Sequence, residues 1–512
     1  MSILKAIEYG SLHMTGALAQ AAPQAGRSVM TTVQDMAYLV ASILFILGIK
    51  RLRSPKTARD GNTIAAAGMA LAIVATLLTA SVSSLVGMAI AALLGSAIGA
   101  VMAARVQMTQ MPQMVALFNG FGGIASALVA GGEWASERAS AAGQQAAPAV
   151  DAAVTHATTS ASTSVETQVM IGLSILIGMV AFTGSLVAAG KLNGNISGKP
   201  IVLPAQLALN VALLVGSLVG IGLFAALGGP MWALALTVAL SAILGVTLTV
   251  PIGGADMPVM VSLLNSYSGL AAAATGFIIF NKALIVSGAL VGASGLILTV
   301  IMCKAMNRSL ANVLFAGIGT ADSTGAASTT ESATGKPVKR ADADDTAIIL
   351  DSAQRVMFVP GYGLAVAQAQ HALRELADEL TRRGVKVMYG VHPVAGRMPG
   401  HMNVLLAEAD VPYEQLLDID QANAEIEQCD VAMVIGANDV VNPATRHDQS
   451  SPIFGMPIID VDKAQTVFVL KRSMAAGYAG VDNELFVADN TLMVFGDAKD
   501  TLQKVLAAIK EL

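Results

Sequence analysis

The stretch Val356-Met357-Phe358-Val359-Pro360-Gly361-Tyr362-Gly363-Leu364-Ala365-Val366 decides the fold of the C-terminal region. It joins an apolar strand to a glycine-containing turn, and we expect the following helix to run through Arg383 before a second strand at 385–389. This order is typical of a βαβ unit with parallel strands. Further strands are predicted at 430–435, 457–461, 466–470 and 491–495, with a closing helix at 498–511. The pattern predicts a Rossmann-like α/β domain with a doubly wound parallel sheet.

Two glycines in the turn indicate a nucleotide site. Gly361 and Gly363 permit a tight turn and a close backbone approach to a pyrophosphate, which would rest on the N-terminus of the next helix. The third position of the pattern is Val366 rather than glycine or alanine, and no acidic residue ends the second strand near Tyr389. The missing acid argues against NAD, because that residue holds the ribose 2′-hydroxyl in NAD sites. A plain tight turn is the alternative interpretation.

Three loops that follow predicted strands supply candidates for the rest of the pocket, because the carboxyl ends of parallel strands meet at one sheet edge. Any one of these loops taken alone is more typical of a solvated surface loop than of a ligand site. Two adjacent cations and a hydroxyl, however, suit a phosphate group. Together the loops favour a phosphorylated dinucleotide, so NADP fits better than NAD. Their candidate residues are Gly396, Arg397, Gly436, Asn438, Asp439, Lys471, Arg472 and Ser473.

Composition places the preceding region in a lipid bilayer. Of the 512 residues, 54% are hydrophobic and 13% are charged, whereas soluble domains usually carry about 25% charged residues. A helix needs about 20 apolar residues to cross a bilayer. We therefore predict nine transmembrane helices, at 34–50, 63–82, 85–104, 113–131, 168–190, 205–226, 231–250, 261–280 and 284–303.

Charge and cysteine content exclude other classes of site. The net charge of −5 gives no basic field for a nucleic-acid partner. Cys303 and Cys429 provide neither a disulfide framework nor a metal site, and we expect both to be buried in a reducing compartment. Lysine and arginine concentrate after the first, third, fifth and ninth spans, and such loops stay cytoplasmic. This pattern predicts an outside N-terminus and a cytoplasmic C-terminal domain.

An internal repeat marks candidate polar residues within the membrane. Residues 111–123 align without gaps to residues 257–269, and each copy begins with Met-Pro. Asn119 and Asn265 occupy matched positions, and Asp256 precedes the second copy. Polar residues in lipid usually face a cavity or another helix, so we expect these three to serve a proton pathway and its coupling. Interhelical hydrogen bonding and a solvated loop acid are the simpler alternatives. All six histidines lie outside the predicted spans.

The domain organisation follows from these observations. We predict an N-terminal leader at 1–32 and a transmembrane domain at 33–305 that holds the proton pathway. A flexible linker follows at 306–345, where small and polar residues cannot build a core. The nucleotide-binding domain is predicted at 346–512.

Several sequence blocks are specific enough to identify a family. In the soluble region these are Gly-Tyr-Gly-Leu-Ala-Val-Ala-Gln-Ala-Gln (361–370), the block from His392 to Ala409, Gly-Ala-Asn-Asp (436–439), Lys-Arg-Ser-Met (471–474) and Gly-Tyr-Ala-Gly (477–480). In the membrane region they are Asp-Met-Pro-Val (256–259), Leu-Leu-Asn-Ser-Tyr-Ser-Gly (263–269) and the block at 301–309. Together these blocks closely resemble the β subunit of proton-translocating NAD(P) transhydrogenase, and the resemblance covers roughly residues 33–512.

The resemblance implies a bacterial inner (plasma) membrane enzyme of the Re/Si-specific type, in which this chain binds NADP(H). A separate α subunit would bind NAD(H), supply further membrane helices and form a dimer of αβ units with this chain. Hydride would pass directly from NADH to NADP⁺, coupled to inward proton movement, without a covalent catalytic residue. By match, Gly361, Tyr362 and Gly363 would cradle the nucleotide in a reversed orientation, Arg397 and Asp439 would line the pocket, Lys471, Arg472 and Ser473 would bind the 2′-phosphate, and Gly477 and Tyr478 would lie in a covering loop.

One departure from the family concerns proton passage. Some members carry a membrane histidine where this sequence has Asn119, so we expect a histidine of the α subunit to face Asn119 and Asn265. We further expect Asp256 and the 304–309 segment to couple protonation to the nucleotide domain. Two other functions fit parts of the pattern: a secondary transporter or channel gated by a nucleotide-sensing domain, and an NADP enzyme with passive membrane anchors. Neither a selectivity filter nor an intramembrane charge pair supports the first, and nine spans exceed what an anchor needs.

Overall fold

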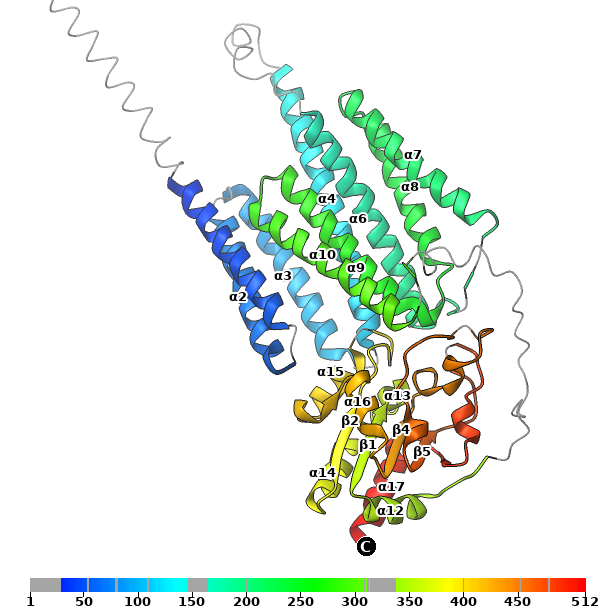
Figure 1. Cartoon of the computed structure of the whole chain (residues 1–512). Helices are drawn as coiled ribbons and strands as arrows, with labels where there is room; N and C mark the ends of the chain where they lie inside the picture. Colours follow the sequence, from blue (N-terminus) through cyan, green and yellow to red (C-terminus); the bar gives the residue numbers. More distant parts are fainter. Residues whose placement is uncertain are drawn as a thin grey trace, which may run out of the picture. The chain divides into compact units, whose positions relative to one another are not determined.

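The computed structural model describes residues 29–52, 55–78, 82–107, 110–145, 164–198, 200–201, 203–307, 309–310, 313, 338–398, 400–451, 453–477 and 479–512. Within these residues, nine helices are long and apolar enough to cross a membrane, which confirms the prediction. They are Val29–Leu52, α2 (Pro55–Leu77), α3 (Val82–Arg105), α4 (Met111–Gln145), α6 (Val165–Leu192), α7 (Gln206–Ala226), α8 (Met231–Thr249), α9 (Met257–Ile278) and α10 (Lys282–Ala305), shown in Figure 1.

The chain forms two compact units. One combines the described helices up to Arg105 with Ala272–Leu290, and the other comprises Val106–Ala271 and Val291–Leu512. In the second unit α4 lies along α6, and α8 lies against both α6 and α7. Small residues allow this close packing: a Cβ on Gly123 of α4 would lie 2.6 Å from the carbonyl oxygen of Gly178 in α6. The α4 and α6 backbones therefore touch without an intervening side chain.

The two copies of the sequence repeat form the starts of α4 and α9. Each helix begins with Met-Pro, and proline is favoured at the first positions because its missing N–H has no partner there. Asn119 and Asn265 therefore lie about two turns into their helices. The Asn119 side chain is buried and donates a hydrogen bond of 3.2 Å to the carbonyl of Val261 in α9. The two copies are thus in direct contact through Asn119.

The C-terminal domain contains the predicted parallel sheet. Its order is β3-β2-β1-β4-β5-β6, and every neighbouring pair is parallel. The chain moves outward in one direction from β1 to β3 and in the other from β4 to β6, so the topological switch point lies between β1 and β4. This confirms the doubly wound arrangement. The strands are β1 (Arg355–Pro360), β2 (Lys386–Gly390), β3 (Leu416–Leu417), β4 (Val431–Ile435), β5 (Thr466–Lys471) and β6 (Thr491–Phe495).

One predicted strand is wrong. Residues 457–460 are irregular, and Val461–Lys463 form the 3₁₀ helix η7, although Ile458 and Ile459 are buried as the pattern requires. Pro457 cannot donate a ladder hydrogen bond, and the N–H of Ile459 bonds instead to the carbonyl of Val440. The remaining strand of the sheet is β3, whose two residues are too short to produce a readable pattern.

Helices cover both faces of the sheet. The single helix expected after β1 is two helices, α13 (Tyr362–Val366) and α14 (Gln370–Arg382), with Gln368 between them in the left-handed region at φ 49°. The other helices of this domain are α12 (Ala343–Ser352), α15 (His401–Glu408), α16 (Ile419–Ile426) and α17 (Ala498–Glu511), with 3₁₀ turns η4 (Tyr413–Gln415), η5 (Asp439–Val441), η6 (Pro443–Arg446) and η8 (Glu484–Val487). A further 3₁₀ turn, η2 (Gly254–Asp256), lies in the membrane region between α8 and α9.

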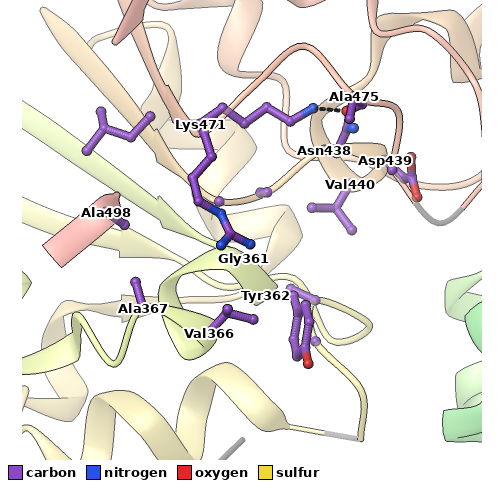
Figure 2. A pocket seen from close by; sticks show the side chains of 18 of the residues that line it. Gly361, Tyr362, Val366, Ala367, Asn438, Asp439, Val440, Lys471, Ala475 and Ala498 are labelled. Carbon is purple, nitrogen blue, oxygen red and sulfur yellow. Dashed lines mark hydrogen bonds between the residues drawn. The ribbon is translucent and has the colours of Figure 1, made fainter. Parts of the chain in front are cut away.

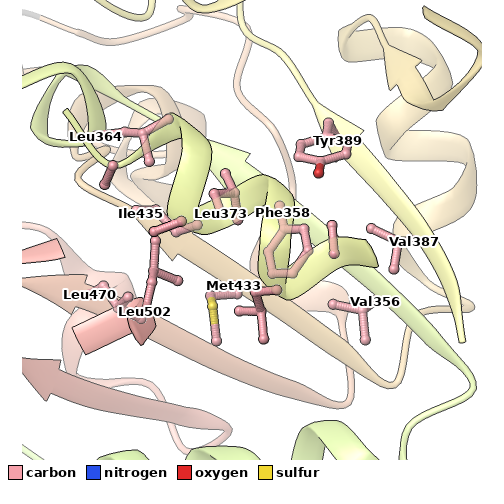
Figure 3. Packing of buried hydrophobic residues seen from close by; sticks show 14 of the residues in the cluster. Val356, Phe358, Leu364, Leu373, Val387, Tyr389, Met433, Ile435, Leu470 and Leu502 are labelled. Carbon is pink, nitrogen blue, oxygen red and sulfur yellow. The ribbon is translucent and has the colours of Figure 1, made fainter. Parts of the chain in front are cut away.

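The helices bury one continuous core on each face. On the face shown in Figure 3, Leu373 of α14 and Leu502 of α17 pack with Phe358 of β1 and Met433 of β4. The amphipathic spacing of α14 explains this, because Leu373, Leu376, Ala377 and Leu380 repeat on one side of the helix. A second cluster, around Met357, Val434 and Ile459, fills the other face. The core fixes the strands, and their carboxyl ends carry the loops described next.

Both cysteines are buried, as predicted. Burial raises the pKa of the Cys429 thiol to about 11. No group of histidine, cysteine and acidic residues among the described residues could hold a metal ion.

Some predicted segments fall on residues outside the described ranges. These include 1–28 of the leader, Arg308 of the 304–309 segment, and most of the predicted linker 306–345. Residues 338–341, at the end of that linker, run beside β6 through a parallel bridge between Arg340 and Met493.

Candidate nucleotide-binding site

A pocket opens at the carboxyl edge of the sheet, at the switch point between β1 and β4. Its volume is about 420 Å³. Loops after β1, β2, β4, β5 and β6 line it, which is where open α/β sheets bind ligands (Figure 2). The lining includes the predicted residues Gly361, Tyr362, Gly363, Val366, Gly396, Gly436, Asn438, Asp439, Lys471, Arg472, Ser473 and Gly477.

The turn after β1 is pressed against the turn after β4. The N–H of Gly361 donates to the carbonyl of Ile435, and the N–H of Gly363 donates to the carbonyl of Gly436, both at 2.9 Å. A Cβ on Gly361 would lie 2.3 Å from the Cα of Ala437, so only glycine fits there. This contact holds the start of α13 at the pocket, where the absence of a side chain on Gly361 and Gly363 lets a ligand approach the backbone closely.

The loop after β4 anchors the segment that follows β5. The Asp439 carboxylate accepts a hydrogen bond of 3.1 Å from the N–H of Ala479. A Cβ on Gly477 would lie 2.4 Å from the same carboxylate, so the segment passes close over Asp439. Tyr478, which the family resemblance assigns to this segment, lies outside the described residues. Asp439 therefore contacts the segment as well as the pocket.

Lys471 ends β5 with its ammonium group beside the pocket. The ammonium donates to the carbonyl of Ala475 and lies 4.6 Å from the ring centroid of Phe486. Burial lowers the pKa of Lys471 to about 8, while the nearby Asp439 carboxylate partly opposes that shift. Arg472 and Ser473 follow and are exposed. Three residues that could donate to a phosphate are therefore adjacent in sequence at the end of β5.

Arg397 does not line the pocket as the family resemblance implied. Its guanidinium stacks over the ring of Tyr362, 4.4 Å from the centroid, and Nη1 donates to the carbonyl of Leu192 at 2.9 Å. Leu192 is the last residue of the membrane helix α6. Arg397 therefore reaches the nucleotide site through Tyr362 rather than by lining the cavity.

Sequence reasoning did not single out eleven of the lining residues, ten of which are small or apolar and one of which is the acidic Asp497 that caps α17. The ten small or apolar side chains carry no chemical signal, and only their position after a strand could have indicated them. The eleven residues are Ala367, Val394, Ala395, Ala437, Val440, Leu470, Ala475, Ala476, Gly496, Asp497 and Ala498.

Two of the three polar candidates in the membrane region are buried. Asn119 joins α4 to α9, as described above, while Asn265 is partly exposed on α9. Asp256 lies in η2 immediately before α9 and is 9% exposed. Burial of two of these three polar side chains fits a role inside the protein rather than contact with lipid.

Comparison with known proteins identifies close relatives. A family model described as NAD(P) transhydrogenase beta subunit matches residues 34–508. Two relatives, both named NAD(P) transhydrogenase subunit beta and both from Rhodospirillum rubrum, one of them from a defined strain, are 49% identical to the chain. Each similarity extends over 473 residues, which is 92% of this chain and 98% of the relative.

Proposed function

The chain belongs to the family of NAD(P) transhydrogenase β subunits, and we propose that its sheet domain is the part that binds NADP(H). Membership makes it an oxidoreductase subunit in which hydride transfer is coupled to proton translocation. The chain is a multi-pass membrane protein, and its partner is an α subunit. The residues at the pocket bear on which nucleotide, NADP(H) or NAD(H), binds to this chain.

The triplet Lys471, Arg472 and Ser473 at the pocket is the observation that carries this proposal. A 2′-phosphate distinguishes NADP from NAD, and adjacent cations with a hydroxyl form the charge-assisted hydrogen bonds that a phosphate needs. The residue after β2 is Val391 rather than an acid, so the usual partner of an NAD 2′-hydroxyl is missing. Both features support NADP(H) here and NAD(H) on the α subunit.

The remaining site residues have positioning roles in this proposal. The Gly361–Gly363 turn lets the nucleotide approach the backbone closely, and Tyr362 and Val366 form the adjoining wall. Gly396, Gly436 and Asn438 shape the neighbouring loops, while Asp439 contacts Gly477 and Ala479 beside the pocket. When bound, the nicotinamide of NADP(H) accepts or gives up the hydride. This chain binds and orients that nucleotide, and none of its residues is a covalent catalyst.

We also propose that Asn119, Asn265 and Asp256 serve the proton pathway and its coupling. Asn119 and Asn265 lie at matched depths in α4 and α9, and Asp256 is buried at the start of α9. A histidine of the α subunit then supplies the group that exchanges protons, because all six histidines of this chain lie outside the spans predicted from its sequence. Replacing every intramembrane histidine of that subunit should abolish pumping, and pumping that persists contradicts this role.

Asp256 and the 304–309 segment are proposed to transmit protonation to the sheet domain. The side chain of Asn307, in that segment, donates to the carbonyl of Phe454 at 2.9 Å, which gives the segment a contact with the sheet domain. An Asp256→Asn variant should lose the dependence of NADP(H) exchange on pH. Unchanged pH dependence would remove Asp256 from the pathway.

The assembly and its orientation complete the proposal. We place the complex in the bacterial inner membrane as a dimer of αβ units, with the N-terminus outside and the sheet domain in the cytoplasm. Positive loops after alternate spans support this orientation.

The test is hydride transfer from NADH to an oxidised NADP analogue in vesicles that contain this chain and the α subunit. With an opposing or driving proton gradient, the forward rate should change, and an uncoupler should abolish that change. Calorimetry on the same complex should show NADP(H) binding to this chain when the NAD(H) site of the α subunit is inactivated. Absence of binding contradicts the assignment, and absence of transfer with any partner favours a gated transporter or channel.

A further inference from the structure

The loop between β2 and α15 contacts both the pocket and the ends of membrane helices. Val394, Ala395 and Gly396 line the pocket, and the next residue is Arg397. All residues discussed below lie within Val106–Ala271 or Val291–Leu512, which together form one compact unit. The loop is therefore placed to carry movement between the two sites, and its individual contacts show how.

The first contact is polar. Arg397 Nη1 donates to the carbonyl oxygen of Leu192 at 2.9 Å, and Gln113 Nε2 of α4 donates to the same oxygen at 3.1 Å. Leu192 ends α6, and the last carbonyls of a helix carry a partial negative charge without partners in the helix. A guanidinium is favourable at this position. Arg397 and α4 are thus joined at one carbonyl at the end of α6.

The second contact is apolar. Val394 packs against a buried cluster that contains Val259 of α9 together with Met302 and Cys303 of α10. The same side chain packs against the core of the sheet domain. Val394 therefore belongs to the packing of both regions, and it also forms part of the pocket wall.

The loop is held rigid by two buried histidines. His392 Nδ1 accepts a hydrogen bond of 3.2 Å from the N–H of Val394, and its Nε2 lies 2.8 Å from the carbonyl of Pro457 and donates to it. His401 Nδ1 accepts from the N–H of Arg397 at 3.1 Å. These bonds fix the backbone on both sides of Gly396, so a displacement of Arg397 moves the pocket wall with it.

The helix that Arg397 touches is tied closely to the helix that carries Asn119. The backbones of α4 and α6 meet at Gly123 and Gly178, and a Cβ on Gly120 would lie 3.0 Å from the Cβ of Ser185 in α6. Close-packed interfaces transmit displacements rather than absorbing them. A shift of α4 near Asn119 therefore reaches the Leu192 end of α6.

We propose that Arg397 is a positioning residue that couples α6 to the nucleotide pocket. Its guanidinium connects the Leu192 carbonyl to the ring of Tyr362, which lines the pocket. When the end of α6 moves, Arg397 moves with it. Arg397 in turn displaces Tyr362 and the pocket wall at Val394–Gly396, and this displacement changes the affinity of the pocket for the nucleotide. This inference rests on the proposed binding of NADP(H) by the sheet domain.

The test compares variants of the full αβ complex in vesicles at saturating nucleotide. The gradient response is defined as the forward hydride-transfer rate with a proton gradient divided by the rate without it. Arg397→Met keeps the length of the side chain but removes the donor, and we expect its gradient response to fall by at least about 5-fold, the lower end of measured coupling between sites. Saturating nucleotide removes any effect that comes only from weaker binding.

Further variants separate coupling from simple loss of structure. Arg397→Lys retains a donor for the Leu192 carbonyl and should recover part of the gradient response. Gln113→Leu leaves the whole pocket intact but removes the second donor to that carbonyl, and it should lower the response in the same direction. Arg382→Met removes a cation from the exposed end of α14 and should leave the response unchanged.

Each outcome decides the proposal. A wild-type response in both Arg397→Met and Gln113→Leu overturns it, as does a failure of Arg397→Lys to recover any response. If Arg397→Met does not fold, Gln113→Leu alone decides. The proposed function fails separately, when the wild-type complex itself does not bind NADP(H).

Discussion

The sheet domain and the membrane helices differ in how many large apolar side chains they expose. In the sheet domain Leu373, Phe358 and Val434 are fully buried, whereas Leu93 of α3 is 71% exposed. The membrane helices also bury hydroxyls beside their apolar clusters, such as Ser262 and Ser266, which donate to the carbonyls of Gly295 and Gly292 in α10. Water surrounds one region and lipid the other, so apolar exposure costs free energy in the first region only.

This contrast changes what a polar residue means in each region. In the sheet domain polar side chains collect in loops at one edge, where a ligand can reach them. Among the membrane helices a buried polar side chain often bonds a neighbouring backbone carbonyl. A functional assignment is therefore sharper for Lys471 than for Asn119, and the variants below test both.

The largest effect is expected at Gly361, where the sheet domain has no space. A Cβ there would lie 2.3 Å from the Cα of Ala437, so Gly361→Ala must separate the β1 and β4 turns. Overpacking of this kind costs about 1–3 kcal/mol of the free energy of unfolding, and NADP(H) binding should be lost. Thermal unfolding and calorimetry on the purified complex measure both. Gly198→Ala, where no atom lies within 4 Å of the added Cβ, is the matched control, and equal behaviour of the two variants would contradict the packing argument.

The next effect is expected at Lys471. Lys471→Met should weaken NADP(H) binding by roughly 10- to 100-fold, the value of one hydrogen bond to a charged group, and should leave the weak binding of NAD(H) unchanged. Calorimetry with both nucleotides gives the ratio. Lys463→Met, which removes an exposed lysine paired with Glu427, should change neither affinity.

The same lysine predicts a pH dependence. Burial lowers its pKa to about 8, so the ammonium loses its proton as the pH rises through that value, and affinity for the 2′-phosphate should fall between pH 7 and pH 9. Lys471→Arg keeps its charge across this range. An equally steep fall in the arginine variant would show that another group is responsible.

Replacement of Asn119 should have a small effect on NADP(H) affinity and a large effect on proton translocation. Asn119→Leu removes the hydrogen bond to the Val261 carbonyl, which is worth about 0.6 kcal/mol in a membrane protein. NADP(H) affinity should therefore change by less than about 3-fold, while proton translocation in vesicles should be lost. Ser262→Ala removes a comparable interhelical bond and should still pump. If the Asn119→Leu variant still translocates protons, the role of Asn119 is limited to its interhelical hydrogen bond with Val261.

The smallest effect concerns the acid stability of the sheet domain. Burial lowers the pKa of His392 to about 4, and its hydrogen bond to the Pro457 carbonyl opposes this only in part. Below the ordinary pKa near 6.5 the unfolded chain takes up a proton that folded His392 does not, so stability is present above that pH and is lost as the pH falls towards 4. The free energy of unfolding should drop by about 1 kcal/mol between pH 7 and pH 5.5.

Unfolding curves for His392→Gln should show less of this acid dependence than the wild type. The exposed His371 of α14 provides the control, because His371→Gln should leave the dependence unchanged. Identical acid dependence in wild type and His392→Gln would mean that other groups control it.

The sequence predicts most of this architecture because buried helices and strands have characteristic lengths and spacings of apolar residues. The nine spans and the main strands are long enough for their apolar patterns to be recognised. The 457–461 segment carries the same apolar pattern, but Pro457 and the bond from Ile459 to Val440 take it out of the sheet. The two residues of β3 are too few to form a recognisable apolar pattern.

The candidate site was predictable where chemistry and strand ends coincide. Lys471 ends β5 and Asp439 lies in the loop after β4, so the parallel topology alone brings them together. The Arg397 guanidinium depends on a contact with Leu192, distant in sequence, which no local pattern encodes. Its placement needed the structure, whereas Asn119 could be located by its repeat but not paired with Val261.

The burial of both cysteines makes the native chain suitable for chemical labelling. Cys303 and Cys429 are the whole complement of thiols, and a pKa of about 11 keeps Cys429 protonated at neutral pH. A maleimide that cannot cross the bilayer would then react only with a cysteine introduced in a loop. Labelling from one side or the other of sealed vesicles can map each loop without first building a cysteine-free background.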